Sequence, residues 1–122
     1  MSNRKHTLVL GASEKPDRYA NIAINRLLDN DIPVIAVGYK KGEVRGVPIK
    51  TEFPINKDIH TLTLYLSTKN QKQYYDDIVS LNPKRVIFNP GTYNKELEEL
   101  LDENNIGYEH ACTLVLLSGG NY

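Results

Sequence analysis

The sequence is poor in the features that mark secreted and membrane proteins. It contains one cysteine, Cys112, which excludes an internal disulfide and fits a reducing compartment. No apolar run approaches the roughly 20 residues that span a bilayer, and the run near the N-terminus is too short for the core of a signal peptide. We therefore expect a soluble, cytoplasmic protein with no membrane partner.

An excess of charge of either sign is also missing. The 15 basic and 15 acidic side chains cancel to a formal net charge of +0. Bulk charge therefore gives no reason to expect a nucleic acid as partner.

The length of 122 residues, with 40% hydrophobic and 25% charged residues, suits one globular domain with a core. We predict a single domain over residues 1–122, and the sequence carries no signal for its oligomeric state.

Short apolar runs alternate along the chain with patterns typical of amphipathic helices. Buried strands are predicted for residues 7–11, 33–38, 61–66 and 85–89, with a short fifth strand beginning at residue 108. Helices are predicted for residues 19–30, 70–81 and 94–104. Residues 39–58 are predicted to be irregular, and residues 113–122 are ambiguous, with a last turn of helix as one interpretation.

Two of the predicted helices begin near side chains suited to capping. Thr68 and Gln71 have the spacing of a capping box, in which the two side chains satisfy free backbone N–H groups reciprocally. Asn94 is a candidate N-cap, because its side-chain oxygen can accept a hydrogen bond from a backbone N–H of the first turn. Both signals support the predicted helix starts.

Continuous apolar strands separated by helices imply a parallel sheet that is covered on both faces. Right-handed crossovers then predict an α/β fold with three layers, a Rossmann-like doubly wound sheet of about five parallel strands. In such folds a ligand binds at the carboxyl edge of the sheet, where the strand order reverses. The loops expected to meet there are residues 11–19, 38–41, 67–69 and 89–93.

The loop after the first strand has the residue types of an anion site. Gly11 allows a tight turn, and the small residues Ala12 and Ser13 let a ligand approach the backbone. The following helix presents free N–H groups and the positive end of its dipole. Ser13 can donate its hydroxyl, and Arg18 and Tyr19 stand at the helix entrance. These features suit a pyrophosphate, with an ordinary strand–helix turn as the alternative.

The end of the second strand distinguishes between nucleotide ligands. Domains that bind NAD place an Asp or Glu there to hold the ribose hydroxyls. This chain has Gly38, Tyr39, Lys40 and Lys41 instead. A basic tip attracts a phosphorylated ribose, which both NADP and coenzyme A carry. The alternative is that the two lysines are solvated turn residues.

Four segments together resemble one known family. The segments are Gly11-Ala12-Ser13 followed by Pro16 and Arg18-Tyr19, then Val37-Gly38-Tyr39-Lys40 with Gly46, then Asn89-Pro90-Gly91, and finally Cys112. They resemble the CoA-binding domain family, whose stand-alone bacterial members are single small Rossmann-like proteins. The same domain forms the N-terminal part of the succinyl-CoA synthetase alpha subunit. The family's second strand ends Asn-Pro-Lys after a valine, and this chain keeps only the Lys.

The resemblance implies how the nucleotide end of coenzyme A would be held. The loop around Ser13 would hold the pyrophosphate, with Arg18 and Tyr19 near it. Lys40 would meet the ribose phosphate. The residues before it, Gly38 and Tyr39, would flank the adenine or the ribose.

The resemblance also implies where the rest of the cofactor would lie. Three residues after the third strand would line the adenine or pantetheine side: Leu66, Ser67 and Thr68. Asn89 and Gly91 would let the pantetheine pass close to the backbone. In succinyl-CoA synthetase the phosphorylated histidine lies in a region beyond the CoA-binding domain, and we expect no counterpart of that region here. The resemblance therefore implies binding without that reaction.

The sequence shows no arrangement of catalytic or metal-binding residues. His6, His60 and His110 are far apart in the sequence, and they do not form a cluster of metal ligands with other residues. His110 is two residues from Cys112, so a His–Cys nucleophile pair is an alternative to a buried, inert cysteine. The leading hypothesis is a small cytosolic protein that binds CoA or acyl-CoA without a catalytic centre of its own. The alternative is an NADP-binding redox enzyme or sensor domain.

Overall fold

The computed structural model describes residues 5–55 and 58–122. The strands in this part of the chain are β1 (Thr7–Leu10), β2 (Val34–Val37), β3 (Gly42–Val44), β4 (Val47–Lys50), β5 (Thr61–Leu64), β6 (Arg85–Phe88) and β7 (Gly107–His110). They form a seven-stranded sheet in the order β3-β4-β2-β1-β5-β6-β7. The β3–β4 pair is antiparallel and the other neighbouring pairs are parallel. The doubly wound α/β class with a Rossmann-like sheet is therefore confirmed, and the sheet has seven strands where about five parallel ones were predicted.

The two additional strands lie in the stretch that was predicted to be irregular. Within residues 39–58, β3 and β4 form a hairpin, and residues 56–57 lie outside the described part. Arg45 and Gly46 connect the two strands, with φ angles of 49° and 86°. Two successive residues at positive φ make the tight hairpin turn that matches the twist of the strands. An arginine is a rare choice for that conformation, which hides the hairpin in the sequence.

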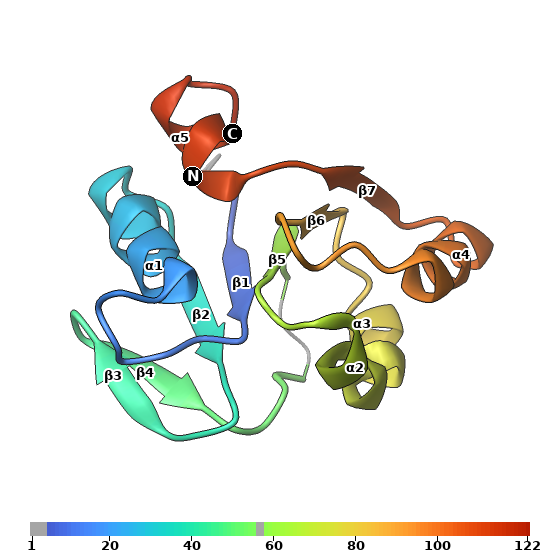
Figure 1. The fold of residues 1–122 in the computed structure, drawn as a ribbon, viewed down its shortest axis with the longest axis horizontal. Helices are drawn as coiled ribbons and strands as arrows, with labels where there is room; N and C mark the ends of the chain where they lie inside the picture. The colour runs from blue at the N-terminus through green and yellow to red at the C-terminus, as the bar shows by residue number, and fades with distance from the viewer. Residues whose placement is uncertain (1–4, 56–57) are drawn as a thin grey trace.

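The helices of the described residues cover both faces of the sheet (Figure 1). They are α1 (Tyr19–Asp29), α2 (Thr68–Gln71), the 3₁₀ turn η1 (Lys72–Tyr74), α3 (Tyr75–Leu81), α4 (Lys95–Glu103) and α5 (Thr113–Ser118). The segments α1 and α5 pack on one face, and α2, α3 and α4 lie on the other. The ambiguous C-terminal stretch is thus partly helical.

One predicted helix is divided, and its predicted capping box is wrong. The helix expected over residues 70–81 consists of α2, η1 and α3 in succession. The N-cap of α2 is Ser67, so Thr68 is already the first helical residue, and no side chain caps this end. Gln71 is fully buried rather than folded back on the helix start. The other predicted cap is confirmed, because the side chain of Asn94 accepts a hydrogen bond from the backbone N–H of Leu97.

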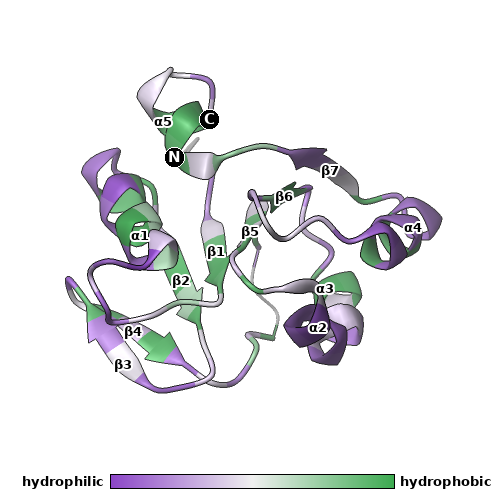
Figure 2. Cartoon of the chain, viewed as in Figure 1, coloured by the Kyte–Doolittle hydropathy of each residue, from purple (hydrophilic) through white to green (hydrophobic). Residues whose placement is uncertain are grey.

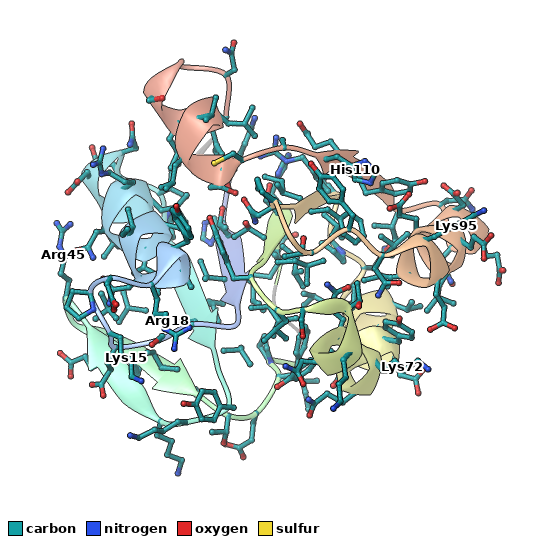
Figure 3. The ribbon with its side chains drawn as sticks, in the orientation of Figure 1. Lys15, Arg18, Arg45, Lys72, Lys95 and His110 are labelled. Carbon is teal, nitrogen blue, oxygen red and sulfur yellow. The ribbon has the colours of Figure 1, made fainter. Side chains whose placement is uncertain are left out.

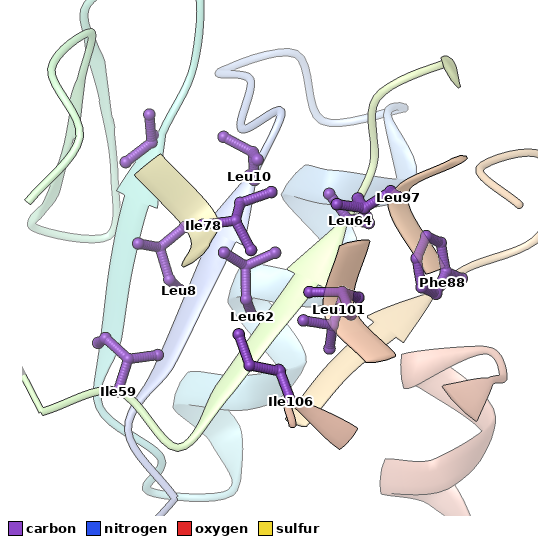
Figure 4. Packing of buried hydrophobic residues seen from close by; sticks show 12 residues of the cluster. Leu8, Leu10, Ile59, Leu62, Leu64, Ile78, Phe88, Leu97, Leu101 and Ile106 are labelled. Carbon is purple, nitrogen blue, oxygen red and sulfur yellow. The ribbon is translucent and has the colours of Figure 1, made fainter. Parts of the chain in front are cut away.

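The core lies in two layers, one on each face of the sheet. Leu8 and Leu10 of β1 point into the layer under α3 and α4, which Figure 4 shows, and Val9 points into the layer under α1. Figure 2 shows apolar residues on the central strands and on the inward sides of the helices. Both β1 and β5 are completely buried along their length, as parallel strands between two helix layers must be.

The strand order places a crevice next to β1. From β1 the chain moves outward to β2 and β4, and it then returns to the opposite side of β1 to form β5. The loops that follow β1 and β5 therefore turn to opposite faces of the sheet. A space opens between them at the carboxyl edge, which is the position where doubly wound folds bind ligands.

Candidate functional site

A cavity of about 410 Å³ lies at this switch point. Its walls come from the loops after β1, β5 and β6, together with Tyr39 from the end of β2. We call it the crevice. Its volume falls within the range of about 300–1,000 Å³ that is usual for small-molecule sites.

The crevice brings together most of the residues that the sequence singled out. Those that line it are Gly11, Ala12, Ser13, Arg18, Tyr19, Tyr39, Leu66, Ser67 and Gly91. Lys40 lines a smaller adjoining cavity of about 90 Å³, which shares Ser13 and Tyr39 with the crevice. The candidates that line the two cavities, from both the nucleotide side and the pantetheine side, thus lie on one continuous surface.

Three candidate residues line neither cavity. Thr68 is exposed in the first turn of α2. Gly38 is buried, and a Cβ on it would lie 2.5 Å from the carbonyl oxygen of Ala12. The Asn89 side chain is also buried and donates to the Leu64 carbonyl oxygen at 2.8 Å and accepts from the Thr113 backbone N–H at 2.9 Å. Gly38 and Asn89 therefore hold the loops that form the crevice and do not face it.

The first loop is held in place from several sides. Its Gly11 has a φ of +100°, and a Cβ there would lie 3.0 Å from the backbone of Tyr65. The backbone N–H groups of Gly11 and Ala12 both donate to the Val37 carbonyl oxygen. The buried side chain of Asn21 in α1 donates to the Ser13 carbonyl oxygen at 3.0 Å. The hydrogen bonds tie the loop to β2 and α1, and the close contact of Gly11 places it against Tyr65 after β5.

The start of α1 faces the same loop. Arg18 is the N-cap, with extended backbone angles, and no side chain caps the helix. The N–H groups of the first turn therefore have no side-chain acceptor at this helix start, and the helix dipole favours an anion there. The Ser13 hydroxyl accepts a hydrogen bond from the Lys15 backbone N–H at 3.1 Å and keeps its own proton for donation.

The charged side chains gather at one end of the crevice. Lys15 and Arg18 line the crevice, and Figure 3 shows both on the loop between β1 and α1. Lys40 and Lys41 line the adjoining cavity, together with Glu14, whose carboxylate accepts from the Glu43 backbone N–H at 2.9 Å. We call this the basic end.

The opposite wall of the crevice carries no charged side chain. It consists of Tyr65, Leu66, Ser67, Asn70, Pro90, Gly91 and Thr92. Burial raises the pKa of the Tyr65 hydroxyl to about 12, and electrostatic interactions with Cys112 and Tyr122 also raise it. Hydrogen bonds with the side chains of Thr113 and Thr63 oppose this shift, since they lower the pKa. Tyr65 is therefore neutral at physiological pH. We call this surface the neutral wall.

Sequence reasoning missed six residues of the crevice: Lys15, Ala20, Tyr65, Asn70, Pro90 and Thr92. Lys15, Pro90 and Thr92 lie inside loops that were expected at the carboxyl edge, so naming every residue of those loops would have included them. Tyr65 was assigned to the buried third strand. It lies one residue beyond β5, where it lines the crevice.

The histidines take part in structural contacts. The His110 ring lies 2.8 Å from the Glu98 carboxylate through Nε2 and stacks on Tyr93 at 4.3 Å between ring centroids. The pKa of His60 is lowered by burial and by the positive charge of Arg85.

Residues 5–55 and 58–122 contain no group of three or more His, Cys, Asp or Glu that could hold a metal ion. No helix among these residues has the length and apolar character needed to cross a membrane.

A mostly parallel sheet with a basic crevice at its switch point defines a Rossmann-like domain of the kind that holds nucleotides. The model of the CoA binding domain matches residues 5–118. The chain therefore belongs to the CoA binding domain family, and the resemblance found in the sequence is confirmed.

Solved structures share this fold over nearly the whole chain. An uncharacterized protein is 50% identical, with a TM-score of 0.95, and the match covers 99% of this chain and 100% of that one. A hypothetical protein from Pyrococcus horikoshii OT3 is 30% identical, with a TM-score of 0.83 over 93% of this chain and 81% of its own. A dinucleotide-forming acetyl-coenzyme A synthetase from Ca. Korarchaeum cryptofilum has the same fold at 14% identity, with a TM-score of 0.73 over 88% of this chain and 26% of its own. The curated proteins gave no match.

Proposed function

We propose that this chain is a cytoplasmic CoA- or acyl-CoA-binding protein without a catalytic centre of its own. The observation that carries the proposal is the division of the crevice into a basic end and a neutral wall. Coenzyme A has the same division. Its nucleotide carries a pyrophosphate and a ribose phosphate, and its pantetheine arm is uncharged.

The basic end suits the nucleotide. The uncapped start of α1, the Ser13 hydroxyl and the Arg18 guanidinium offer donors for a pyrophosphate on one side of the crevice. Lys40 and Lys41 line the adjoining cavity, where a ribose phosphate would lie. Tyr39 is 82% exposed and lines both cavities, so its ring is free to lie against the adenine or the ribose.

The neutral wall suits the pantetheine arm. Gly91 has no atom within 4 Å of the position where a Cβ would stand, so the backbone there is open to close approach. Ser67 and Asn70 add polar groups that can pair with the amides of the arm. Family membership supports the same ligand.

The alternative ligand is NADP, since its ribose phosphate would also suit the basic end. Calorimetric titration with CoA, acetyl-CoA, dephospho-CoA, NADP and NAD separates the two candidates. The proposal predicts binding of CoA or acetyl-CoA and weaker binding of dephospho-CoA. Binding of NADP with no heat from CoA would replace the proposal with the redox alternative.

A further inference from the structure

The side chain of Gln71 joins the two loops that form the neutral wall. It stands at the end of α2 and is fully buried. Its Nε2 donates to the Leu66 carbonyl oxygen at 2.9 Å and to the Thr92 carbonyl oxygen at 2.8 Å. Leu66 follows β5 and Thr92 follows β6, and both line the crevice. Because backbone carbonyls only accept hydrogen bonds, the amide must face them with its NH₂ group.

A second amide fixes the orientation of the first. The Nδ2 of Asn94 donates to Oε1 of Gln71 at 2.9 Å and to the hydroxyl of Tyr75 at 2.8 Å. Its Oδ1 accepts from the Leu97 N–H at the start of α4. The chain of bonds therefore runs from the cap of α4 through two buried amides to both loops of the neutral wall. Each donor and acceptor in it has its partner, which makes such a network rigid.

The bridge sets the separation of the two loops. Without the Gln71 amide, two backbone carbonyls and the Asn94 donor would lie without their partner in a site with little water, and such groups are costly to leave unpaired. The loops would move apart or rotate to find other partners. The basic end should change less than the neutral wall, because the bonds of Gln71 reach neither the loop after β1 nor the end of β2.

We propose that Gln71 is a positioning residue that holds the neutral wall at the separation a pantetheine arm requires. It thereby determines how much the arm adds to the affinity of the nucleotide, without touching the ligand. This inference rests on the proposed function, since it assumes that CoA lies in the crevice with its arm along the neutral wall.

The test compares CoA with 3′,5′-ADP, which has the adenosine, the ribose 3′-phosphate and the first 5′-phosphate of CoA and lacks its second 5′-phosphate and its pantetheine arm. The second phosphate would lie at the basic end, so a change confined to the neutral wall still acts on the arm alone. Both are titrated calorimetrically into the wild-type chain, Gln71→Met and Gln73→Met. Methionine has a similar size and cannot donate a hydrogen bond. Gln73 is an exposed glutamine of η1, two positions along, and serves as the matched control.

We expect Gln71→Met to weaken CoA about tenfold and 3′,5′-ADP less than about twofold, which corresponds to the loss of one or two hydrogen bonds on the arm's side alone. Gln73→Met should bind both ligands as the wild-type chain does. Equal losses for the two ligands, or no loss for either, would overturn the role of Gln71 while leaving the proposed function intact. A wild-type chain that binds CoA no better than 3′,5′-ADP would instead show that the arm has no site.

A second variant covers the case in which Gln71→Met does not fold. Asn94→Asp keeps an oxygen to cap α4 and replaces the donor that faces Gln71 with a carboxylate oxygen. The Gln71 amide must then turn its NH₂ group toward the new carboxylate and away from the loops. We expect the same selective loss of CoA affinity, and an unchanged ratio of CoA to 3′,5′-ADP affinity would contradict the inference.

Discussion

Gly38 lies directly against the carbonyl group of Ala12, and a Cβ at Gly38 would be 2.5 Å from that oxygen. This contact joins the end of β2 to the first loop of the crevice. The backbone N–H groups of Gly11 and Ala12 in the same loop also donate to the Val37 carbonyl oxygen, at the end of β2. The position of the loop therefore depends on the absence of a side chain at Gly38.

The substitution Gly38→Ala should displace the first loop. We expect a loss of about 1–3 kcal/mol in the free energy of unfolding, as is usual when a group is forced into a packed site. CoA affinity should fall as well, because the loop that would hold the pyrophosphate moves. Gly107→Ala is the control, since a Cβ there meets only the Lys84 carbonyl oxygen at an ordinary 3.4 Å. Urea unfolding and calorimetry measure the two effects, and equal behaviour of both variants would contradict the prediction.

The substitution Lys40→Ala should remove the preference for CoA over dephospho-CoA. The side chain is exposed, so its ion pair with the ribose phosphate is screened by solvent, and we expect a preference of about fivefold in the wild-type chain. Lys69→Ala is the matched control, because Lys69 is exposed and lines neither the crevice nor the cavity beside it. Calorimetry with the two ligands provides the measurement. If the wild-type chain binds both equally, Lys40 does not meet that phosphate.

The substitution Arg18→Gln should weaken CoA, dephospho-CoA and 3′,5′-ADP, because all three carry phosphate at the position next to the start of α1. A charge-assisted hydrogen bond of this kind contributes about 1.5–3 kcal/mol, which is a loss of roughly tenfold or more. The loss should shrink as salt is added, since salt screens exposed charges. Arg26→Gln, in the last turn of the same helix, should bind all three normally. A loss of affinity confined to CoA would show that Arg18 does not contact the phosphate that the three ligands share.

The hydroxyl of Tyr65 should make stability depend on alkaline pH. Burial raises its pKa to about 12 in the folded chain, from the ordinary value of 10.0 that applies to the unfolded chain. Between these two pH values the unfolded chain loses a proton that the folded chain keeps. The contribution of Tyr65 to the free energy of unfolding is therefore fully present below pH 10.0 and is lost as the pH rises toward 12. The slope is about 1 kcal/mol per pH unit for this group.

Urea unfolding across that pH range measures the effect. The dependence should be smaller in Tyr65→Phe than in the wild-type chain, and Tyr39→Phe should resemble the wild-type chain because Tyr39 is 82% exposed. Identical slopes in all three proteins would show that the Tyr65 hydroxyl is not buried as described.

Much of the fold follows from local patterns in the sequence. The apolar run at Thr7 and the helix beginning at Tyr19 were predicted nearly to the residue, because buried strands and amphipathic helices leave periodic apolar patterns. The β3–β4 hairpin was missed, because its turn uses Arg45 at positive φ, where glycine or asparagine is the usual signal. Gln71 was assigned to a capping box because the helix was expected to begin after Thr68.

The sequence by itself determined the class of fold, the loops that meet at the carboxyl edge and the family of the chain. Each depends on residue types at short spacing, which are visible along the chain. Only the tertiary structure decided that Gln71 bridges Leu66 and Thr92, residues that are 5 and 21 positions away from it. It likewise decided that Gly38 and Asn89 are buried against the loops of the crevice and do not line it. Hydrogen bonds and close contacts of this kind depend on how separate loops fold onto one another, and no local spacing encodes them.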